Sequence, residues 1–204
     1  ITAVPASVTR VQADTIEAAT NSGINSYSIA DKGYTIIKAL HSADELIYLD
    51  TKYSGTVDAS AVQIITGKFE DINKAYLANL AGTITGLGNE EIELEADTST
   101  DTSDLNLLNS RTTGNIDATS FTKLTGTASD FSTLFSNEGS GANQVNLNTG
   151  VTLTISSGTA NASVLNTLNS KTTGNIDATN VTELYGIVSD LSTLFDNEAD
   201  SGNW

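Results

Sequence analysis

The sequence predicts an α/β protein, a repeat solenoid of strand–short helix units with a parallel sheet. Three observations predict it. Residues 105–138 recur at 165–198, alternating apolar runs typical of strands stand at 91–94 and 151–155, and leucines recur three residues apart in the segments that follow. A right-handed parallel β-helix is the alternative fold, because the units are rich in Thr, Asn and Gly, which are weak helix formers.

The repeat is the strongest signal in the chain. Segments 105–138 and 165–198 are identical at 24 of 34 positions, at a constant offset of 60 residues. A more diverged copy lies upstream, where residues 55–60 match residues 114–119 at an offset of 59. We divide the chain into a diverged opening repeat (1–41), a first recognisable repeat (42–82), a second (83–144) and a third (145–204), predicted to form one continuous solenoid.

The first half of each repeat predicts a strand followed by a short helix. The strand is the alternating run at 91–94 or 151–155, and the helix is predicted over 162–169. The helix is followed by Thr172, Thr173 and Gly174, and we expect the glycine to supply the positive φ that often ends a helix.

The second half predicts a shorter strand and further helical turns. Residues 175–179 form the expected strand, with Ile176 pointing inward. Ser189 or Thr179 is expected to cap the helical turns, whose apolar face carries Leu191, Leu194 and Phe195. A strand and a short helix cannot bury this face alone, so neighbouring units are expected to stack with their strands parallel.

Composition excludes several classes of protein. The 204 residues carry 25 acidic and 9 basic side chains, a net charge of −16, which disfavours binding to nucleic acid. No apolar run approaches the length that spans a bilayer, so no membrane insertion is expected. Without Cys there is no disulfide and no thiolate nucleophile.

The sequence offers little for catalysis, and we predict that the protein is not an enzyme. His41 is the only histidine and is expected to be an exposed residue at a turn. The GxSxG pattern of serine hydrolases does not occur, and the glycines at 86 and 88 lack the further glycine and lysine of a phosphate-binding loop. No cofactor is required by any motif.

Calcium is the one metal for which candidate ligands exist. Acidic residues gather in two loops, and carboxylate oxygens are ligands that Ca²⁺ prefers, although neither loop has EF-hand spacing. The candidates are Asp97, Asp101, Asp104, Asp196, Glu198 and Asp200.

Other aspartates recur in register between repeats. Asp58, Asp117 and Asp177 follow the short strand, and Asp71, Asp130 and Asp190 precede helical segments. Local hydrogen bonds explain them better than metal binding, because Asp closes turns after strands and favours the first turn of a helix.

Several phrases resemble a known type of repeat. They are Ile84-Thr-Gly-Leu-Gly-Asn-Glu90, the octapeptide TTGNIDAT and the heptapeptide LNTLNSK. They resemble repeat units of giant extracellular or cell-surface proteins of marine bacteria and cyanobacteria, including adhesins, calcium-binding secreted proteins and a surface protein of swimming motility. The resemblance extends from about residue 42 onward and implies no catalytic residues.

These observations predict a structural protein at the cell surface or outside the cell. We expect a stalk, filament or surface-layer segment whose partners are other copies of itself or neighbouring repeats. The alternative is an adhesin module that contacts surface glycans or another cell through the tyrosines of its first third. Those tyrosines are also explained by burial. They are Tyr27, Tyr34, Tyr48, Tyr53 and Tyr76.

Overall fold

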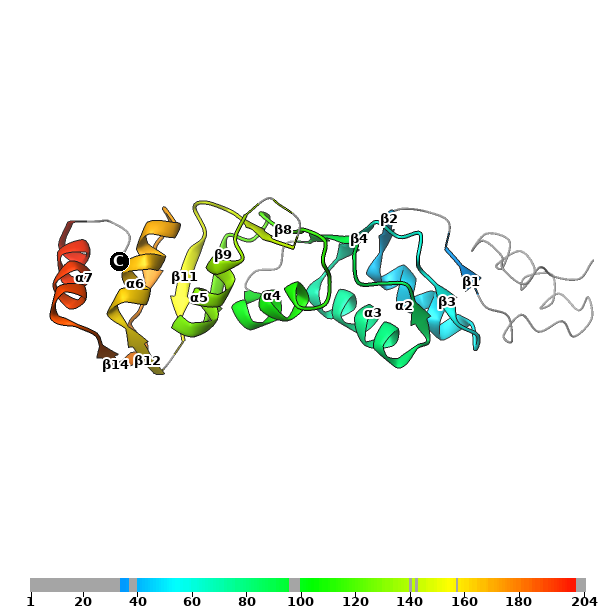
Figure 1. Cartoon of the computed structure of the whole chain (residues 1–204), viewed down its shortest axis with the longest axis horizontal. Helices are drawn as coiled ribbons and strands as arrows, with labels where there is room; N and C mark the ends of the chain where they lie inside the picture. Colours follow the sequence, from blue (N-terminus) through cyan, green and yellow to red (C-terminus); the bar gives the residue numbers. More distant parts are fainter. Residues whose placement is uncertain are drawn as a thin grey trace, which may run out of the picture. The chain divides into compact units, whose positions relative to one another are not determined.

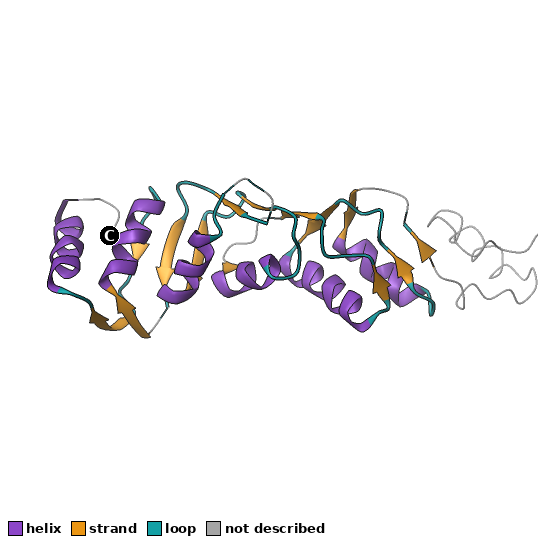
Figure 2. Ribbon diagram, viewed as in Figure 1, coloured by secondary structure: helices purple, strands orange, loops and turns teal. Residues whose placement is uncertain are grey.

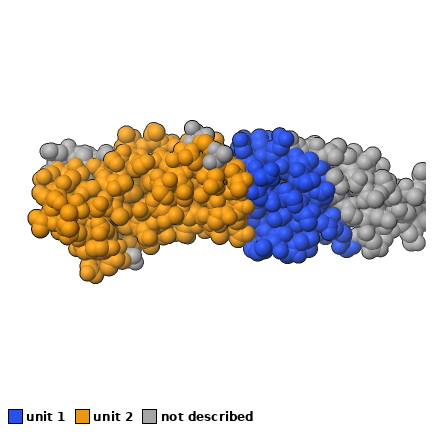
Figure 3. Space-filling model, viewed as in Figure 1, with its two compact units in different colours: residues 1–93 blue, residues 94–204 orange. Residues whose placement is uncertain are grey.

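The computed structural model describes residues 34–36, 40–95, 100–139, 141, 143–156 and 158–200 (Figure 1). It divides into two compact units, residues 1–93 and 94–204 (Figure 3). The described residues hold six helices. Helices alternate along the chain with short strands (Figure 2), and the strand pairs whose register is given are parallel.

The first unit contains two helices and two sets of short strands. β3 pairs with both β1 and β5, and β4 lies between β2 and β6. The two helices pack against each other. The elements in chain order are β1 (Tyr34–Thr35), β2 (Leu40–Ser42), α2 (Ala43–Lys52), β3 (Val57–Asp58), β4 (Ile64–Gly67), α3 (Phe69–Ala81), β5 (Ile84–Thr85) and β6 (Glu91–Leu94).

The second unit contains four helices and further short strands. Its strands form a sheet of order β13-β11-β9-β7, and β8 also pairs with β10 and β12 with β14. The helices pack in chain order, α4 on α5, α5 on α6 and α6 on α7. The elements are β7 (Thr100–Asp101), α4 (Thr102–Asn109), β8 (Ile116–Ala118), β9 (Lys123–Gly126), α5 (Ala128–Ser136), β10 (Val145–Leu147), β11 (Thr152–Ile155), β12 (Gly158–Asn161), α6 (Ala162–Lys171), β13 (Ile176–Asp177), β14 (Val181–Tyr185) and α7 (Val188–Asp200).

The strand registers confirm the α/β class with parallel sheets. Paired residues lie 23 to 29 positions apart, from Tyr34 with Val57 at the short end to Lys123 with Thr152 at the long end. A helix lies between many of the paired strands, as a parallel connection requires. The six helices exclude the pure β-helix that the sequence left as the alternative.

In α4 and α6 a side-chain N-cap and a buried leucine pair occur together. The Asp101 carboxylate accepts a hydrogen bond of 2.8 Å from the backbone N–H of Ser103 and so caps α4. Asn161 caps α6 through the N–H of Ser163 at 2.9 Å. In both helices the leucines three residues apart are buried in the core, Leu105 and Leu108 in α4 and Leu165 and Leu168 in α6.

Two predicted details of the helix ends are wrong. Gly174 has no positive φ. A Cβ atom at this position would overlap the carbonyl oxygen of Val151, so the glycine permits a close approach between two backbones. The expected caps also differ, because Thr179 donates its hydroxyl to Asp177 at 2.6 Å and Ser189 lies inside α7.

The structure also contains more strands than the sequence predicts. We expected one strand before each helix in the first half of a repeat, but β9 and β14 add strands directly before α5 and α7. β9 has four residues, of which only Leu124 and Gly126 are buried. A strand with one large buried side chain carries no alternating pattern, which is why the sequence did not reveal it.

Three glycines let the chain pass close to the start of an earlier helix. Gly67, Gly126 and Gly186 face Ala43, Thr102 and Ala162, the first residues of α2, α4 and α6, each 24 positions earlier. At Gly126 a Cβ atom would overlap the Thr102 hydroxyl, which donates to the carbonyl oxygen of Thr125 at 3.2 Å. Glycine therefore sets how closely neighbouring layers approach.

We expect Gly126→Ala to lower the free energy of unfolding by about 1–3 kcal/mol, because the added methyl group displaces the buried Thr102 side chain. Urea titration followed by circular dichroism measures the change. The control is Gly150→Ala in the same unit, where the added methyl would meet only ordinary contacts at 3.6 and 3.7 Å. Equal effects of the two substitutions would contradict the close-packing role.

Candidate functional site

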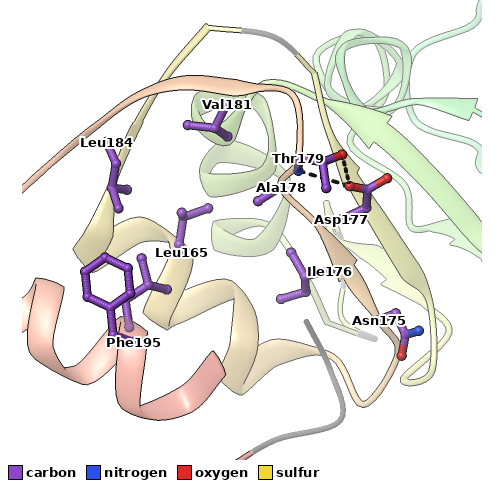
Figure 4. Close-up of a pocket in the computed structure, with 10 residues that line it drawn as sticks. Leu165, Asn175, Ile176, Asp177, Ala178, Thr179, Val181, Leu184 and Phe195 are labelled. Carbon is purple, nitrogen blue, oxygen red and sulfur yellow. Dashed lines mark hydrogen bonds between the residues drawn. The ribbon is translucent and has the colours of Figure 1, made fainter. Parts of the chain in front are cut away.

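The second unit carries a surface where large apolar side chains are partly or wholly exposed. β14 and α7 form it, and a hollow of about 500 Å³ opens beside them, lined by Leu165, Ile176, Leu184 and Phe195 among others (Figure 4). We call it the β14–α7 surface and define it by Val181, Leu184, Tyr185, Ile187, Val188 and Phe195.

Counterparts of several of these residues, 60 positions earlier, are buried. Phe135 is 4% exposed whereas Phe195 is 57% exposed, and Ala128 is 5% exposed whereas Val188 is 84% exposed. Leu124 and Phe121 are buried, but their counterparts Leu184 and Val181 are half-buried. The difference in exposure therefore follows from what lies beside each residue in the fold.

The sequence analysis did not single out this surface, although a signal for it exists. Tyr185 replaces Thr125, and Ile187 replaces Thr127. Thr127 caps α5 in a capping box with Asp130, a role that isoleucine cannot take at the start of α7. Two apolar residues have thus replaced polar ones in a repeat that is otherwise closely conserved within the chain.

The lining of the hollow is mainly apolar and favours contact with apolar side chains. Its carboxylate, Asp177, is already hydrogen-bonded by the backbone N–H and the hydroxyl of Thr179, at 3.0 and 2.6 Å (Figure 4). The polar groups of the lining therefore close a local turn.

Of the candidate calcium ligands, the side chains of Asp101, Asp104 and Asp196 are described. Asp101 caps α4, Asp104 lies in the first turn of the same helix, and Asp196 is exposed on α7. Asp97 lies outside the described residues, and of Glu198 and Asp200 only the helical backbone is described. Within the described part of the chain, no three acidic or histidine side chains are placed to share an ion.

Several of the aspartates in register make local hydrogen bonds. Asp58 accepts from the backbone N–H of Ser60 at 3.0 Å, and Asp117 accepts from Thr119 at 2.9 Å. Asp130 bonds the hydroxyl of Thr127 at 2.6 Å in the capping box of α5. These are the turn and helix-start roles that local hydrogen bonding predicts.

Hydrogen bonds lower the pKa of two of these carboxyl groups. For Asp177 the largest cause is the hydrogen bond from the Thr179 hydroxyl, followed by that from the Thr179 backbone; slight burial acts in the opposite direction, and Lys123 adds a small lowering. The pKa of Asp58 is lowered in the same way by the hydroxyl and backbone N–H of Ser60.

The predictions for His41 and the tyrosines are only partly confirmed. His41 is 7% exposed in β2, so the expected exposed turn is wrong; its Nδ1 lies 3.1 Å from the Glu45 carboxylate. Tyr53 and Tyr76 are buried, whereas Tyr48 is partly exposed. Tyr27 and the side chain of Tyr34 lie outside the description, and the described tyrosines form no shared exposed face.

A buried carboxylate organises the loop that carries the sequence GLGNE. Glu90 accepts a hydrogen bond from the Tyr76 hydroxyl and from the backbone N–H groups of Gly88 and Asn89, at 2.8 and 3.1 Å for the last two. Asn79 of α3 holds the same loop through both backbone groups of Leu87. This carboxylate therefore has a full set of structural partners.

Comparison with protein-family models, with curated proteins and with solved structures found no match. None of the described helices has the length and apolar character that crossing a membrane requires.

We expect Asp177→Asn to reduce the pH dependence of stability in acid. The lowered pKa means that the folded carboxylate stabilises the protein above the ordinary value of 3.8 and that this contribution is lost as pH falls below it. Asparagine preserves the turn but does not titrate, so urea unfolding of the variant should change less between about pH 4 and pH 2. Asp196→Asn, an equal charge change on exposed α7, is the control; an identical flattening in both variants would contradict the explanation.

We expect removal of calcium to change stability little. If the acidic loops bind Ca²⁺ only weakly, a chelator should lower the free energy of unfolding by less than about 1 kcal/mol. Thermal melting with EDTA, and with excess CaCl₂, measures this. A loss of the fold in EDTA would show that the aspartates hold an essential ion.

Proposed function

We propose that this chain is a structural segment of a cell-surface or extracellular protein, a solenoid that extends and spaces other parts. The observation that carries the proposal is a helix-to-helix contact that recurs at the 60-residue offset. The Asn106 side chain donates to the carbonyl oxygen of Asp130 at 3.0 Å, and Asn166 donates to that of Asp190 at 2.9 Å. Each bond ties one helix to the first turn of the next.

Strand pairing supports the same arrangement. β9 pairs with β7 on one side and β11 on the other, so successive layers share strands as well as helices. The buried leucines of α4 and α6 lie in the core. In a stack of this kind each layer excludes water from its neighbours, and stability grows with the number of layers.

The polar composition suits a structural role. Many Thr, Ser and Asn side chains bond to the backbone of turns and helices, such as Thr172 to Val151 at 2.6 Å and Asn148 to Gly150 at 2.9 Å. Without cysteine the fold depends on no disulfide and on no redox compartment. These features favour a protein that holds its shape by stacking and exposes an acidic, well-solvated surface.

The proposal is tested by adding repeats. We expect a chain extended after Asp200 by a second copy of residues 141–200 to be more stable in urea than the original. Its maximum dimension in small-angle X-ray scattering should grow by about 10 Å per added repeat, which is two strand spacings. Residues 141–200 expressed alone, as the matched control, should be marginally stable or unfolded.

Two outcomes would contradict the proposal. The excised repeat would have to unfold as cooperatively as the whole chain, or the extended chain would have to gain neither stability nor length. Either result would mean that the units do not depend on stacking.

A further inference from the structure

We propose that the β14–α7 surface binds a second copy of this chain, stacked head to tail. The inference rests on the proposed function, because it extends to a second molecule the layer contacts that the chain makes within itself. It names the partner and the surface through which segments of this kind would join.

The strands beneath the surface have one neighbour where their counterparts have two. β9 pairs with β7 and β11, whereas its counterpart β14 pairs only with β12 among the described residues. Likewise α5 contacts both α4 and α6, whereas α7 contacts α6 and no further described helix. In the next repeat the positions that correspond to β11 and α6 lie beyond the described residues, so the part of the chain that the structure describes leaves this side of β14 and α7 uncovered.

The chain itself carries another unit of this repeat type near its start. Residues 34–52, which contain β1, β2 and α2, align with residues 153–171 at a constant offset of 119. This unit also keeps Leu40 and Tyr48 exposed, at 53% and 39%. The identical positions are Thr35, Ile36, Ala43, Leu46, Leu49 and Lys52. A second copy therefore supplies a unit of the sequence type that packs on α5.

Charge favours this head-to-tail arrangement over a twofold one. Two copies related by a twofold axis would pair β14 with itself, which brings Glu183 of the two chains together in an acidic environment. Glu183 corresponds to Lys123 in the preceding repeat. Within the chain Lys123 pairs with Thr152 in the parallel register of β9 and β11. At the offset of 119 the residue of a second copy that takes the place of Thr152 is Gly33, which carries no charge that could repel Glu183.

The net charge of −16 opposes the approach of any two copies. Salt screens charges on exposed surfaces, with a Debye length of about 30 Å at 0.01 M and about 3 Å at 1 M. Association through apolar side chains should therefore strengthen as salt is raised, whereas association through ion pairs would weaken.

Sedimentation velocity of the full chain tests the proposal. The protein concentration is varied from low micromolar to about 1 mM, at low salt and at about 0.5 M NaCl. We expect concentration-dependent association that is stronger at high salt. Val188→Asp and Phe195→Asp should each weaken it at least about tenfold. Both side chains are exposed in the single chain, so the variants should keep the circular dichroism spectrum of the parent.

Leu80→Asp is the matched control, because Leu80 is 80% exposed on α3 and loses a similar apolar area without touching the β14–α7 surface. It should associate as the parent does. A parent chain that stays monomeric at every concentration and salt would overturn the inference, and so would an equal loss of association in the control.

The chain extended by residues 141–200 separates this inference from the proposed function. If both hold, the extended chain is more stable and still associates, now through the same surface on its added repeat. Greater stability in an extended chain, together with a strictly monomeric parent, would overturn association between copies while supporting the stacked architecture.

Discussion

The fold depends on exclusion of water between neighbouring strand–helix layers. A helix such as α4 contributes only Leu105 and Leu108 as large side chains to the core, so we expect that one strand–helix layer has too little apolar surface to fold alone. Close contact between layers is therefore essential. The glycines that face Ala43, Thr102 and Ala162 permit this contact, and the asparagines at 106 and 166 hold the helices in line. Hydrophobic burial and hydrogen bonding thus act at the same interfaces.

Many elements of this fold could be predicted because the sequence repeats. The strands at 91–94 and 151–155 and the helix at 162–169 carry their own periodicity, and the parallel arrangement follows from strands joined through helices. β9 and β14 could not be predicted, because their pairing depends on neighbours 23 to 29 positions away in the chain. The role of Gly174 was mistaken for the same reason, since the atom that it must avoid belongs to Val151.

The exposure of the β14–α7 surface could not be predicted from the sequence. Phe135 and Phe195 are the same residue in nearly the same local sequence, yet one is buried and the other is exposed. Burial here depends on the next layer and not on the residue itself, so no local pattern distinguishes the two. The in-register aspartates behave oppositely: their hydrogen bonds join residues two or three positions apart, and local sequence was sufficient to predict them.

The near-identity of the two copies in the second unit has a consequence for how the chain folds. The segments at 105–138 and 165–198 could exchange places and still satisfy most of their local hydrogen bonds, which invites mispairing during folding. The two close contacts of the copies differ in side-chain size. Gly126 faces Thr102, whereas Gly186 faces the smaller Ala162. Small differences of this kind favour the correct order of the segments over an exchanged one. Sequence divergence between the two copies should therefore reduce mispairing during folding.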